Sequence, residues 1–319
     1  MTILVTGGNG FIGSNFIYDW FNLTDEEIIN VDSLTYSSSN YIEHIKSDQL
    51  KSRVVNVKDK DSIIYLLEKY RPRAIVHFAA ESHVDNSIKD PLLFFKTNIL
   101  GTANLLECVK KVDKSIKFLH VSTDEVFGSL GEYDNPSTEY SSYKPNSPYS
   151  ASKASSDHIV RAYNKTYGLQ TIITNCSNNY GRFQHQEKFI PTVIRSCLQG
   201  KNIPIYGNGK QIRDWLFVSD HCSALRLLLE KGTVGETYNI GGDNQITNLE
   251  VVNMICDYLD KIRPKNNLYS NSISFVSDRP GHDIRYDIDS SKIQELGWKQ
   301  TVLFNIGLQK TIDWYIEHE

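Results

Sequence analysis

A tyrosine and a lysine one helical turn apart are the first residues of this 319-residue chain whose types and spacing could do chemistry. Tyr149 and Lys153 stand at positions i and i+4, so a helix would carry both side chains on one face. An ammonium group beside a phenol stabilises the phenolate, and we therefore expect Lys153 to lower the pKa of Tyr149 from its reference value of about 10. Tyr149 could then take the proton of a hydroxyl group during hydride transfer. The alternative is that this spacing reflects only amphipathic packing on a helix surface.

Two neighbouring acids form a second candidate set at the end of a predicted strand. Thr123, Asp124 and Glu125 follow the strand-like run Lys117–Ser122, and in open α/β sheets ligands bind at the carboxyl ends of strands. Two carboxyls in one site can be pushed apart in pKa, so that one is protonated while the other is ionised. An oxidation needs neither, because Tyr149 already handles the hydroxyl proton, whereas elimination of water needs an acid and a base together. The alternative is an exposed, solvated Asp-Glu turn.

A glycine-rich loop predicts a dinucleotide site. The run Gly7-Gly-Asn-Gly10-Phe-Ile-Gly13 follows a predicted strand and opens a predicted helix, which is the context that gives such a motif its value. Gly7 would make the tight turn, Gly10 would let backbone N–H groups approach a pyrophosphate, and Gly13 would let the helix pack closely on the strand. Asp32 ends the second predicted strand, where a carboxylate binds a ribose hydroxyl and repels a 2′-phosphate, so NAD is favoured over NADP. The alternative is a structural glycine turn with Asp32 as a helix cap.

The elements that must position these residues alternate between strands and helices over the first part of the chain. Strands are predicted at Thr2–Thr6, Glu27–Val31, Arg53–Val57, Ala74–Ala79, Lys117–Ser122 and Gln170–Asn175, and helices at Phe11–Phe21, Lys60–Tyr70, Pro91–Val112 and Tyr149–Tyr167. This order predicts the α/β class, with a Rossmann-type, doubly wound parallel sheet. Beyond residue 177 segments shorten and turn residues become denser, which predicts a first domain over 1–177 that carries the dinucleotide motif and a smaller, mixed α/β lobe over 178–319. Some later segments are expected to pack back on the first domain.

Composition and charge exclude several classes of protein. The chain has 34 Lys and Arg against 38 Asp and Glu, a formal charge of −4, so no excess of base suggests a general attraction to nucleic acid. The 5 cysteines are odd in number and form no C-x-x-C pair, which argues against a disulfide framework or a metal site and favours free thiols in a reducing cytoplasm. The sequence has no run of 18 apolar residues and no signal-peptide pattern, so neither a membrane span nor secretion is expected.

Several phrases of the sequence together resemble one family over nearly the whole chain. They are TGGNGFIGSNF, VDSLTY, HFAAESHVDNS, TNILGT, HVSTDEVFG, SPYSASKASSDH, NCSNNYGRFQHQEKFIP, PIYGNGKQIRDWLFVSDH, YNIGG and DRPGHDIRYDID. The chain resembles the dTDP-glucose 4,6-dehydratases, which are extended short-chain dehydrogenases/reductases among the NAD-dependent epimerases and dehydratases. The Thr-Asp-Glu phrase separates this family from the sugar-nucleotide 4-epimerases, which lack the acid pair.

The resemblance implies conversion of dTDP-glucose to the dTDP-4-keto-6-deoxy sugar with NAD recycled, usually as a step toward rhamnose or a related deoxysugar. Tyr149, helped by Lys153, would take the proton of the 4-hydroxyl group, and Thr123 would hydrogen-bond the C4 oxygen. Glu125 would remove the C5 proton while Asp124 protonates the departing 6-hydroxyl group.

The resemblance also implies two sets of binding residues. Besides Gly7, Gly10, Gly13, Tyr149 and Lys153, the cofactor set is Phe11, Ile12, Asp32, Ser33, Leu34, Thr35, Asn56, Val57, Phe78, Ala79, Ala80, Thr97 and Asn179. Besides Thr123, the substrate set is Ser82, Asn178, Lys188, Phe189, Pro204, Ile205, Tyr206, Arg213, Asn248, Asp278, Arg279 and His282. Lys188, Arg213 and Arg279 could neutralise a diphosphate and Tyr206 could stack on thymine. The alternative is that Tyr206 belongs to the core and the cations are solvated.

The sequence departs from the family pattern at a few positions and leaves some alternatives open. Asn56 stands where the family commonly has Asp, Ser33 replaces a frequent Lys, Phe189 replaces a frequent Leu, and the stretch 128–148 is compact. These departures alter loop contacts rather than the acid–base set. A 4,6-dehydratase of another nucleotide sugar, such as UDP-glucose, and a catalytically silent NAD-binding protein stay open.

The family resemblance finally implies a homodimer. The helices predicted at Pro91–Val112 and Tyr149–Tyr167 have apolar faces that could form a four-helix interface between two copies. The sequence does not separate such a face from a buried one.

Overall fold

The computed structural model describes residues 1–45 and 47–318, and its main feature is a parallel sheet of seven strands in the order β10-β6-β5-β4-β1-β2-β3. The strands are β1 (Thr2–Thr6), β2 (Glu27–Asp32), β3 (Leu50–Val54), β4 (Ala74–His77), β5 (Lys117–Thr123), β6 (Thr171–Cys176) and β10 (Thr237–Ile240). Each neighbouring pair is parallel, so all seven strands end at the same edge of the sheet. The predicted Rossmann-type α/β class is confirmed.

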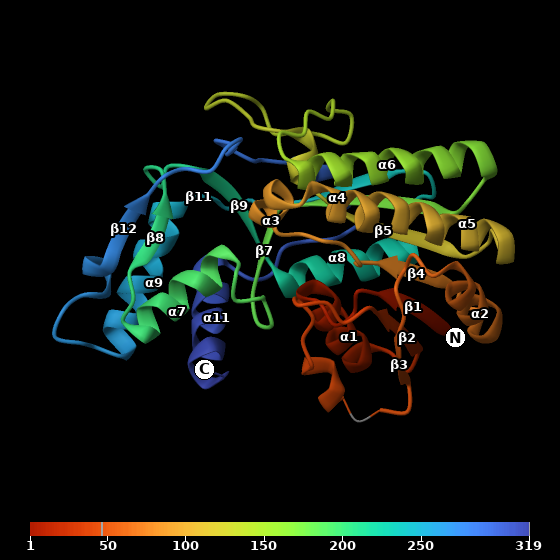
Figure 1. The fold of residues 1–319 in the computed structure, drawn as a ribbon, viewed down its shortest axis with the longest axis horizontal. Coiled ribbons are helices and arrows are strands. Elements are labelled where there is room, and N and C mark those ends of the chain that lie inside the picture. Colours follow the sequence, from red (N-terminus) through yellow and green to blue (C-terminus); the bar gives the residue numbers. More distant parts are fainter. Residues whose placement is uncertain (46, 319) are drawn as a thin grey trace.

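Helices cover both faces of this sheet (Figure 1). One face carries α1 (Phe11–Leu23) and α8 (Val218–Lys231), and the other carries α2 (Lys60–Tyr70), α5 (Thr102–Val112) and α6 (Pro148–Tyr167). Successive residues of β1 alternate between the two cores: Ile3 and Val5 pack on the α1 side, and Leu4 packs on the α2 side. A strand buried on both faces shows up in the sequence as the continuous apolar run that predicted it.

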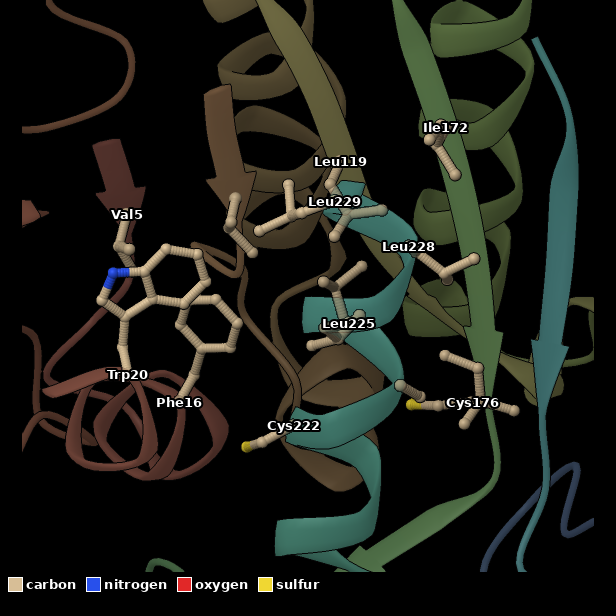
Figure 2. Packing of buried hydrophobic residues seen from close by; sticks show 14 of the residues in the cluster. Val5, Phe16, Trp20, Leu119, Ile172, Cys176, Cys222, Leu225, Leu228 and Leu229 are labelled. Carbon is tan, nitrogen blue, oxygen red and sulfur yellow. The ribbon is translucent and has the colours of Figure 1, made fainter. Parts of the chain in front are cut away.

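The core on the α1 side joins early and late parts of the chain (Figure 2). Phe16 and Trp20 of α1 lie with their ring centroids 5.3 Å apart, close to Val5 of β1. Leu225 and Leu228 of α8 fill the same layer beneath β5 and β6. Burying a leucine contributes about 1.5–3 kcal/mol, so α8 is held firmly against the first sheet.

A smaller lobe lies beside the sheet, at the left of Figure 1. Its strands form a three-stranded sheet in the order β11-β9-β7 and a two-stranded pair, β12-β8. They are β7 (Asn178–Tyr180), β8 (Ile203–Tyr206), β9 (Ile212–Phe217), β11 (Gln245–Thr247) and β12 (Ile273–Val276). With α7 (Phe189–Gln199), α9 (Asn248–Ile262) and α11 (Phe304–His318) they enclose a separate hydrophobic core.

Short elements complete the chain. They are the helices α3 (Val84–Lys89), α4 (Pro91–Phe94) and α10 (Ser291–Glu295), the π-helix η2 (Phe95–Gly101) and the 3-10 turns η1 (Tyr41–His44), η3 (Asp124–Phe127) and η4 (Tyr269–Ser272). Over residues 1–45 and 47–318, no helix combines the length and the apolar composition needed to cross a bilayer.

The predicted helix Pro91–Val112 is present but is not a uniform α-helix, because α4 passes through the π-helix η2 into α5. Within η2, the amide of Asn98 accepts a hydrogen bond from the backbone N–H of Glu81 at 2.9 Å and donates to the hydroxyl of Ser152 at 2.8 Å. These bonds tie the widened turns to the segment after β4 and to α6. A π segment barely changes the apolar spacing of a sequence, so periodicity could not reveal it.

Two strands show the main differences from prediction, and β4 also ends two residues before its predicted end at Ala79. The strand predicted at Arg53–Val57 is wrong by three residues, because β3 covers Leu50–Val54. β3 is an edge strand whose last three residues are exposed, so no buried apolar run marks its bounds. β10 belongs to the later part of the chain yet pairs with β6 in the first sheet, a pairing that the sequence did not predict.

We predict that Leu225→Ala lowers the free energy of unfolding by about 2–5 kcal/mol, because it leaves a cavity between α8 and the sheet. Leu225 is fully buried, whereas Leu303 is 70% exposed, so Leu303→Ala serves as a matched control that should cost about 0.5 kcal/mol or less. Thermal and urea unfolding measure both changes. Equal losses in the two variants would contradict the placement of α8 in the core of the sheet.

Candidate active site

The glycine loop between β1 and α1 has no room for side chains at two positions. A Cβ atom at Gly13 would lie 2.3 Å from the carbonyl oxygen of Gly7, and one at Gly7 would lie 2.6 Å from the backbone nitrogen of Ala79. Gly7 also has a φ of +73°, which favours glycine. Helix α1 therefore begins in contact with β1 and with the end of β4, and its first residues, Phe11 and Ile12, line a cavity at the carboxyl edge of the sheet.

Asp32 ends β2 with its carboxylate held by three hydrogen bonds. Oδ2 accepts one from the backbone N–H of Asn9 at 3.0 Å. Oδ1 accepts one from the backbone N–H of Leu34 at 2.8 Å and one from the hydroxyl of Ser38 at 3.1 Å. The bond to Asn9 fixes the carboxylate against the glycine loop, so the loop and the acid form one rigid unit.

Two adjoining cavities run along the carboxyl edge and share lining residues of the glycine loop and of the turn after β4. The first is lined by the predicted cofactor residues Gly7, Gly10, Phe11, Ile12, Gly13, Phe78, Ala80, Tyr149, Lys153 and Asn179. The second is lined by Gly7, Gly10, Asp32, Ser33, Thr35, Asn56, Val57, Phe78, Ala79, Ala80 and Thr97. Of the predicted cofactor residues, all of which the structure describes, Leu34 lines neither cavity, and its side chain is exposed.

The paired cavities fit a dinucleotide. The N-terminus of α1 meets both cavities through Gly10, and backbone donors at a helix N-terminus suit a pyrophosphate. Asp32 lines one cavity and can accept from a ribose hydroxyl, while Tyr149 and Lys153 line the other. Each half of a dinucleotide therefore has a cavity of its own, with the glycine turn between them.

Some lining residues escaped the sequence analysis. They include Lys58, Glu81 and Leu93 in the second cavity and Cys176, Ser177, Gln184, His185 and Glu187 in the first. His185 and Glu187 stand next to the predicted Lys188, and that adjacency was an available signal. Lys58 comes from the turn after β3 and Leu93 from α4, and their meeting depends on the fold, so no local pattern marked them.

The acid pair sits at the end of β5, in the first cavity. The hydroxyl of Thr123 accepts from the backbone N–H of Glu125 at 3.3 Å and donates to Oδ1 of Asp124 at 3.2 Å. Asp124 is 2% exposed, and its Oδ2 has no hydrogen-bond partner among the described residues. Burial, and then the charge of Glu125, raises the pKa of Asp124 well above its usual value, so Asp124 is a neutral acid with one oxygen free for a ligand.

Glu125 differs from Asp124 because cations face it. Burial in the cavity raises the pKa of Glu125, while the charges of Arg279, Arg213 and Lys188 oppose the rise. Asp124 receives such help from Arg213 but also feels the negative charge of Glu125. The two carboxyls are thus unequal, and Glu125 ionises more readily of the two.

Tyr149 and Lys153 lie one turn apart on α6, but the expected pKa of Tyr149 is wrong for the protein alone. Burial, and then the charge of Glu125, raises the pKa of Tyr149 well above its usual value, and the hydroxyl of Thr123 only partly opposes this. The ammonium of Lys153 instead donates to the backbone carbonyl of Val121 at 2.8 Å, and burial lowers its pKa. The i, i+4 spacing correctly predicted that the two groups lie one turn apart. It gave no information on how strongly the loss of hydration on burial shifts the pKa of each group.

Three predicted substrate cations reach the acid pair from the second lobe. Lys188 donates from its ammonium to the backbone carbonyl of Ser82 at 2.6 Å. Arg213 is buried, donates to the carbonyls of Ile212 at 2.7 Å and Asp283 at 2.9 Å, and lies with its guanidinium carbon 4.4 Å from the ring centroid of Tyr286. It is therefore not a solvated surface cation.

The predicted nucleotide residues gather around one acid of α3. Nη1 of Arg279 lies 3.4 Å from Oδ1 of Asp85, and the hydroxyl of Tyr206 donates to Oδ2 of the same carboxylate at 3.1 Å. Tyr206 is 41% exposed, so it does not belong to the core. His282 is fixed separately, with Nδ1 at 2.6 Å from Oδ1 of Asp278.

The predicted substrate residues divide into two groups. Ser82, Thr123, Asn178 and Lys188 line the first cavity. Phe189, Pro204, Ile205, Tyr206, Arg213, Asn248, Asp278, Arg279 and His282 do not line it. Within that second group, Ile205 is buried in the core of the smaller lobe, and Phe189 stacks on Trp215 with ring centroids 6.2 Å apart. Their side chains support the lobe rather than face the cavity.

The comparison with known families decides the membership of the chain. The model of the GDP-mannose 4,6 dehydratase family matches residues 4–311. The chain belongs to this family. Among curated members, it is 49% identical to the dTDP-glucose 4,6-dehydratase of Salmonella typhimurium over 99% of this chain and 93% of that protein. It is 48% identical to dTDP-glucose 4,6-dehydratase 1 of Escherichia coli over 100% of this chain and 93% of that protein.

Solved structures with a similar fold include both dehydratases and epimerases. A dTDP-glucose 4,6-dehydratase of Streptomyces venezuelae with NAD and TYD bound matches with a TM-score of 0.92 and 42% identity, over 99% of this chain and 97% of that chain. A UDP-glucose 4-epimerase of Thermotoga maritima matches with a TM-score of 0.90 at 26% identity, over 100% and 99% of the two chains. The fold alone therefore does not distinguish a dehydratase from an epimerase. The distinction has to come from side chains of the site, in particular Asp124 and Glu125.

We predict that Asp124→Asn stabilises this member of the family increasingly as the pH rises from about 5 to 8. A carboxyl whose pKa is raised on folding costs stability once the pH exceeds its unfolded value of about 3.9, and the cost grows until the folded pKa is reached. An amide avoids that cost, which we expect to be about 1 kcal/mol or more at pH 8. Melting temperatures of both proteins across this range measure the effect.

Asp257→Asn is the control for this measurement, because Asp257 lies exposed on α9. Its effect on the melting temperature should not grow with pH. A gain from Asp124→Asn that is flat over the same range would show that Asp124 is already ionised in the folded protein.

Proposed function

We propose that the chain is an NAD-dependent dTDP-glucose 4,6-dehydratase, which converts dTDP-glucose to dTDP-4-keto-6-deoxyglucose and water. The observation that carries this proposal is the neutral, buried Asp124 beside the more readily ionised Glu125 in the cavity that also holds Tyr149. An oxidoreductase or epimerase has no need of such a pair, whereas an elimination requires an acid and a base in one site. Relatives at 48–49% identity that bear this name support the same substrate.

NAD is the proposed cofactor, held by the glycine loop, by Asp32 and by the other residues that line the two cavities. The chemistry that NAD supplies when bound is a reversible two-electron oxidation, first at C4 of the sugar and later reversed at C6. The carboxylate of Asp32 would repel a 2′-phosphate, so NADP is disfavoured. NAD is also named in the titles of similar solved structures of dTDP-glucose 4,6-dehydratases.

The side chains of the cavity then divide the proton transfers. Tyr149 accepts the proton of the 4-hydroxyl group, the charge of Lys153 stabilises the phenolate that this requires, and Thr123 hydrogen-bonds the C4 oxygen. Once C4 is a ketone, the neighbouring C5 proton is acidic and Glu125 removes it. Asp124 gives its proton to the 6-hydroxyl group, which leaves as water. The raised pKa of Asp124 keeps that proton available at neutral pH.

The second lobe would bind the nucleotide diphosphate. Lys188, Arg213 and Arg279 provide three positive charges near the acid pair. Arg279 and the hydroxyl of Tyr206 share one anionic partner, Asp85. A diphosphate would take the place of that carboxylate as the partner of Arg279. The ring of Tyr206 would then be free to stack on thymine.

We extend the proposal to organisation and setting. Residues 1–177 would form the NAD-binding domain and residues 178–319 mainly the substrate-binding lobe, with α8 and β10 returning to the first domain. Two chains would pair through a four-helix interface of the α4–α5 run and α6, which is supported by the exposed side chains of Leu92 and Leu100 on that run. Five buried free thiols support the cytoplasm as its location.

The experiment that tests the function is one NMR time course. Purified protein is mixed with dTDP-glucose without added NAD, and a new 6-methyl doublet should appear, because a recycled cofactor stays with the protein. A parallel sample with UDP-glucose should react far more slowly. A doublet only with UDP-glucose would reassign the nucleotide, and no doublet with either sugar after NAD is added would favour a silent NAD-binding protein.

We predict that Glu125→Gln slows formation of the methyl product by about 10²–10⁴-fold, because the base for C5 is lost. Oxidation at C4 should continue, so the near-ultraviolet absorbance of reduced nicotinamide should accumulate. Tyr149→Phe should lower the rate as strongly without that accumulation, because the first step is blocked. Stopped-flow absorbance and NMR measure the two outcomes.

Glu132→Gln and Tyr133→Phe are the matched controls, since both side chains lie exposed in the loop before α6. Neither should change the rate. Loss of product without reduced cofactor in Glu125→Gln would contradict the division of work between Glu125 and Tyr149.

A further inference from the structure

A buried carboxylate on α6 has no part in the proposed proton transfers. Asp157 is 1% exposed, and its Oδ2 accepts hydrogen bonds from the hydroxyls of Ser122 and Tyr143, both at 3.0 Å, and from the amide of Asn175 at 3.1 Å. These donors come from β5, from the loop before α6 and from β6. Three donors to one oxygen leave no place for a proton on it.

The other oxygen of Asp157 faces a histidine rather than a permanent cation. Oδ1 lies 3.2 Å from Nε2 of His120, which is equally buried. Burial, and then the charge of Lys153, lowers the pKa of His120, so the imidazole is neutral at pH 7. Among the described residues, no lysine or arginine lies within ion-pair distance of Asp157, so its charge is not cancelled locally.

Lys153 lies one helical turn before Asp157 and is a buried cation rather than a buried anion. Its ammonium is buried, and its hydrogen bond to the carbonyl of Val121 supplies a dipole but no charge. Burial lowers the pKa of Lys153, and the largest opposing influence is the charge of Asp157. The i, i+4 spacing on α6 holds the two charges at a fixed separation.

Other ionisable groups surround this region. They are Tyr149 and Arg161 on α6 itself, His77 on β4, His120 on β5, Asp124 and Glu125 on η3, Cys176 on β6 and Tyr143 in the loop before α6. The helices α3 and η2, which also pack on α6, carry Asp85, Lys89 and Lys96. Glu107 of α5 bonds instead to Tyr163, further along α6. Burial raises the pKa values of Asp124 and of the Cys176 thiol, so both are neutral. Among these groups, Asp157 is the carboxylate whose position is fixed by three hydrogen-bond donors.

We propose that Asp157 is a positioning residue of the dehydration, whose fixed carboxylate keeps Lys153 an ammonium beside Tyr149. The inference rests on the proposed function and adds a residue to it. Asp157 touches neither reacting atom and acts through Lys153. Three donors hold Oδ2 at one point, and Oδ1 faces the neutral His120 without a hydrogen bond. Helix α6 therefore carries the ammonium and its counter-charge one turn apart.

The test is the pH dependence of kcat/KM in the holoenzyme of Asp157→Asn. Without the anion, the ammonium of Lys153 loses its proton more readily, so the alkaline limb should move to lower pH by about 0.5–1 unit. The acid limb should move less, because Asp157 is not among the main charges that act on Glu125 or Tyr149. A uniform loss of activity with both limbs unmoved would overturn the proposal.

Two variants separate charge from structure. Asp157→Glu keeps the charge and should return the alkaline limb toward its wild-type position. Tyr143→Phe removes one donor to Oδ2 and no charge, so it should lower the melting temperature and leave both limbs in place. An alkaline limb that moves equally in Tyr143→Phe would assign the effect to packing and overturn the proposal.

A measurement on the wild-type chain guards against misfolding of Asp157→Asn. Carbon-13 NMR of aspartate-labelled holoenzyme at pH 7, with Asp157 assigned by its absence from Asp157→Glu, should show an ionised carboxylate, because three donors occupy Oδ2. The shift of a protonated carboxyl there would overturn the inference. Wild-type turnover is measured first: no product would overturn the proposed function, whereas product with an unmoved limb in Asp157→Asn would overturn this inference alone.

Discussion

Parallel pairing of the seven strands is the constraint on which the rest of the structure depends. Because the strands run in one direction, the glycine loop after β1, Asp32 after β2, Thr123 at the end of β5 and Asn178 after β6 all arrive at one edge. The pairing of β5 with β6 continues to the last residues of both strands, Thr123 and Cys176. These four parts of the site need no scaffold of their own, because the parallel pairing already sets where each strand ends.

Exclusion of water at that edge shifts the pKa values of the side chains that the strands and α6 bring there. The same burial raises the pKa values of Asp124 and Tyr149 and lowers that of Lys153, so each group is pushed toward its neutral form. Local charges then decide which group keeps its charge, and the cations around Glu125 and the anion near Lys153 act in opposite senses. Burial away from water, combined with charges placed near only some of the groups, allows one fold to hold an acid and a base within one turn of chain.

The sequence predicted those parts of the fold that local rules decide. Helix α2 matches its predicted bounds Lys60–Tyr70 because Asp59 caps its start and Arg71 takes a left-handed conformation at its end. The edge strand β3 and the π segment η2 were missed or misplaced because neither leaves a distinctive apolar pattern. At the site, motifs brought the glycine loop and the acid pair together correctly. Asp157 could not be found, since its donors meet only in the folded sheet.

Strand β10 has a consequence for how the polypeptide is made. It pairs with β6 but is synthesised only after the whole of α7, β8, β9 and α8. On the ribosome, the nascent chain therefore carries β6 as an open edge until Thr237–Ile240 has emerged from the exit tunnel. Open edges recruit strands from other molecules, whereas β3 at the opposite side carries Lys51 and Arg53, which blunt its edge. Residues 171–176 are thus a segment of the growing polypeptide that needs protection from aggregation during translation.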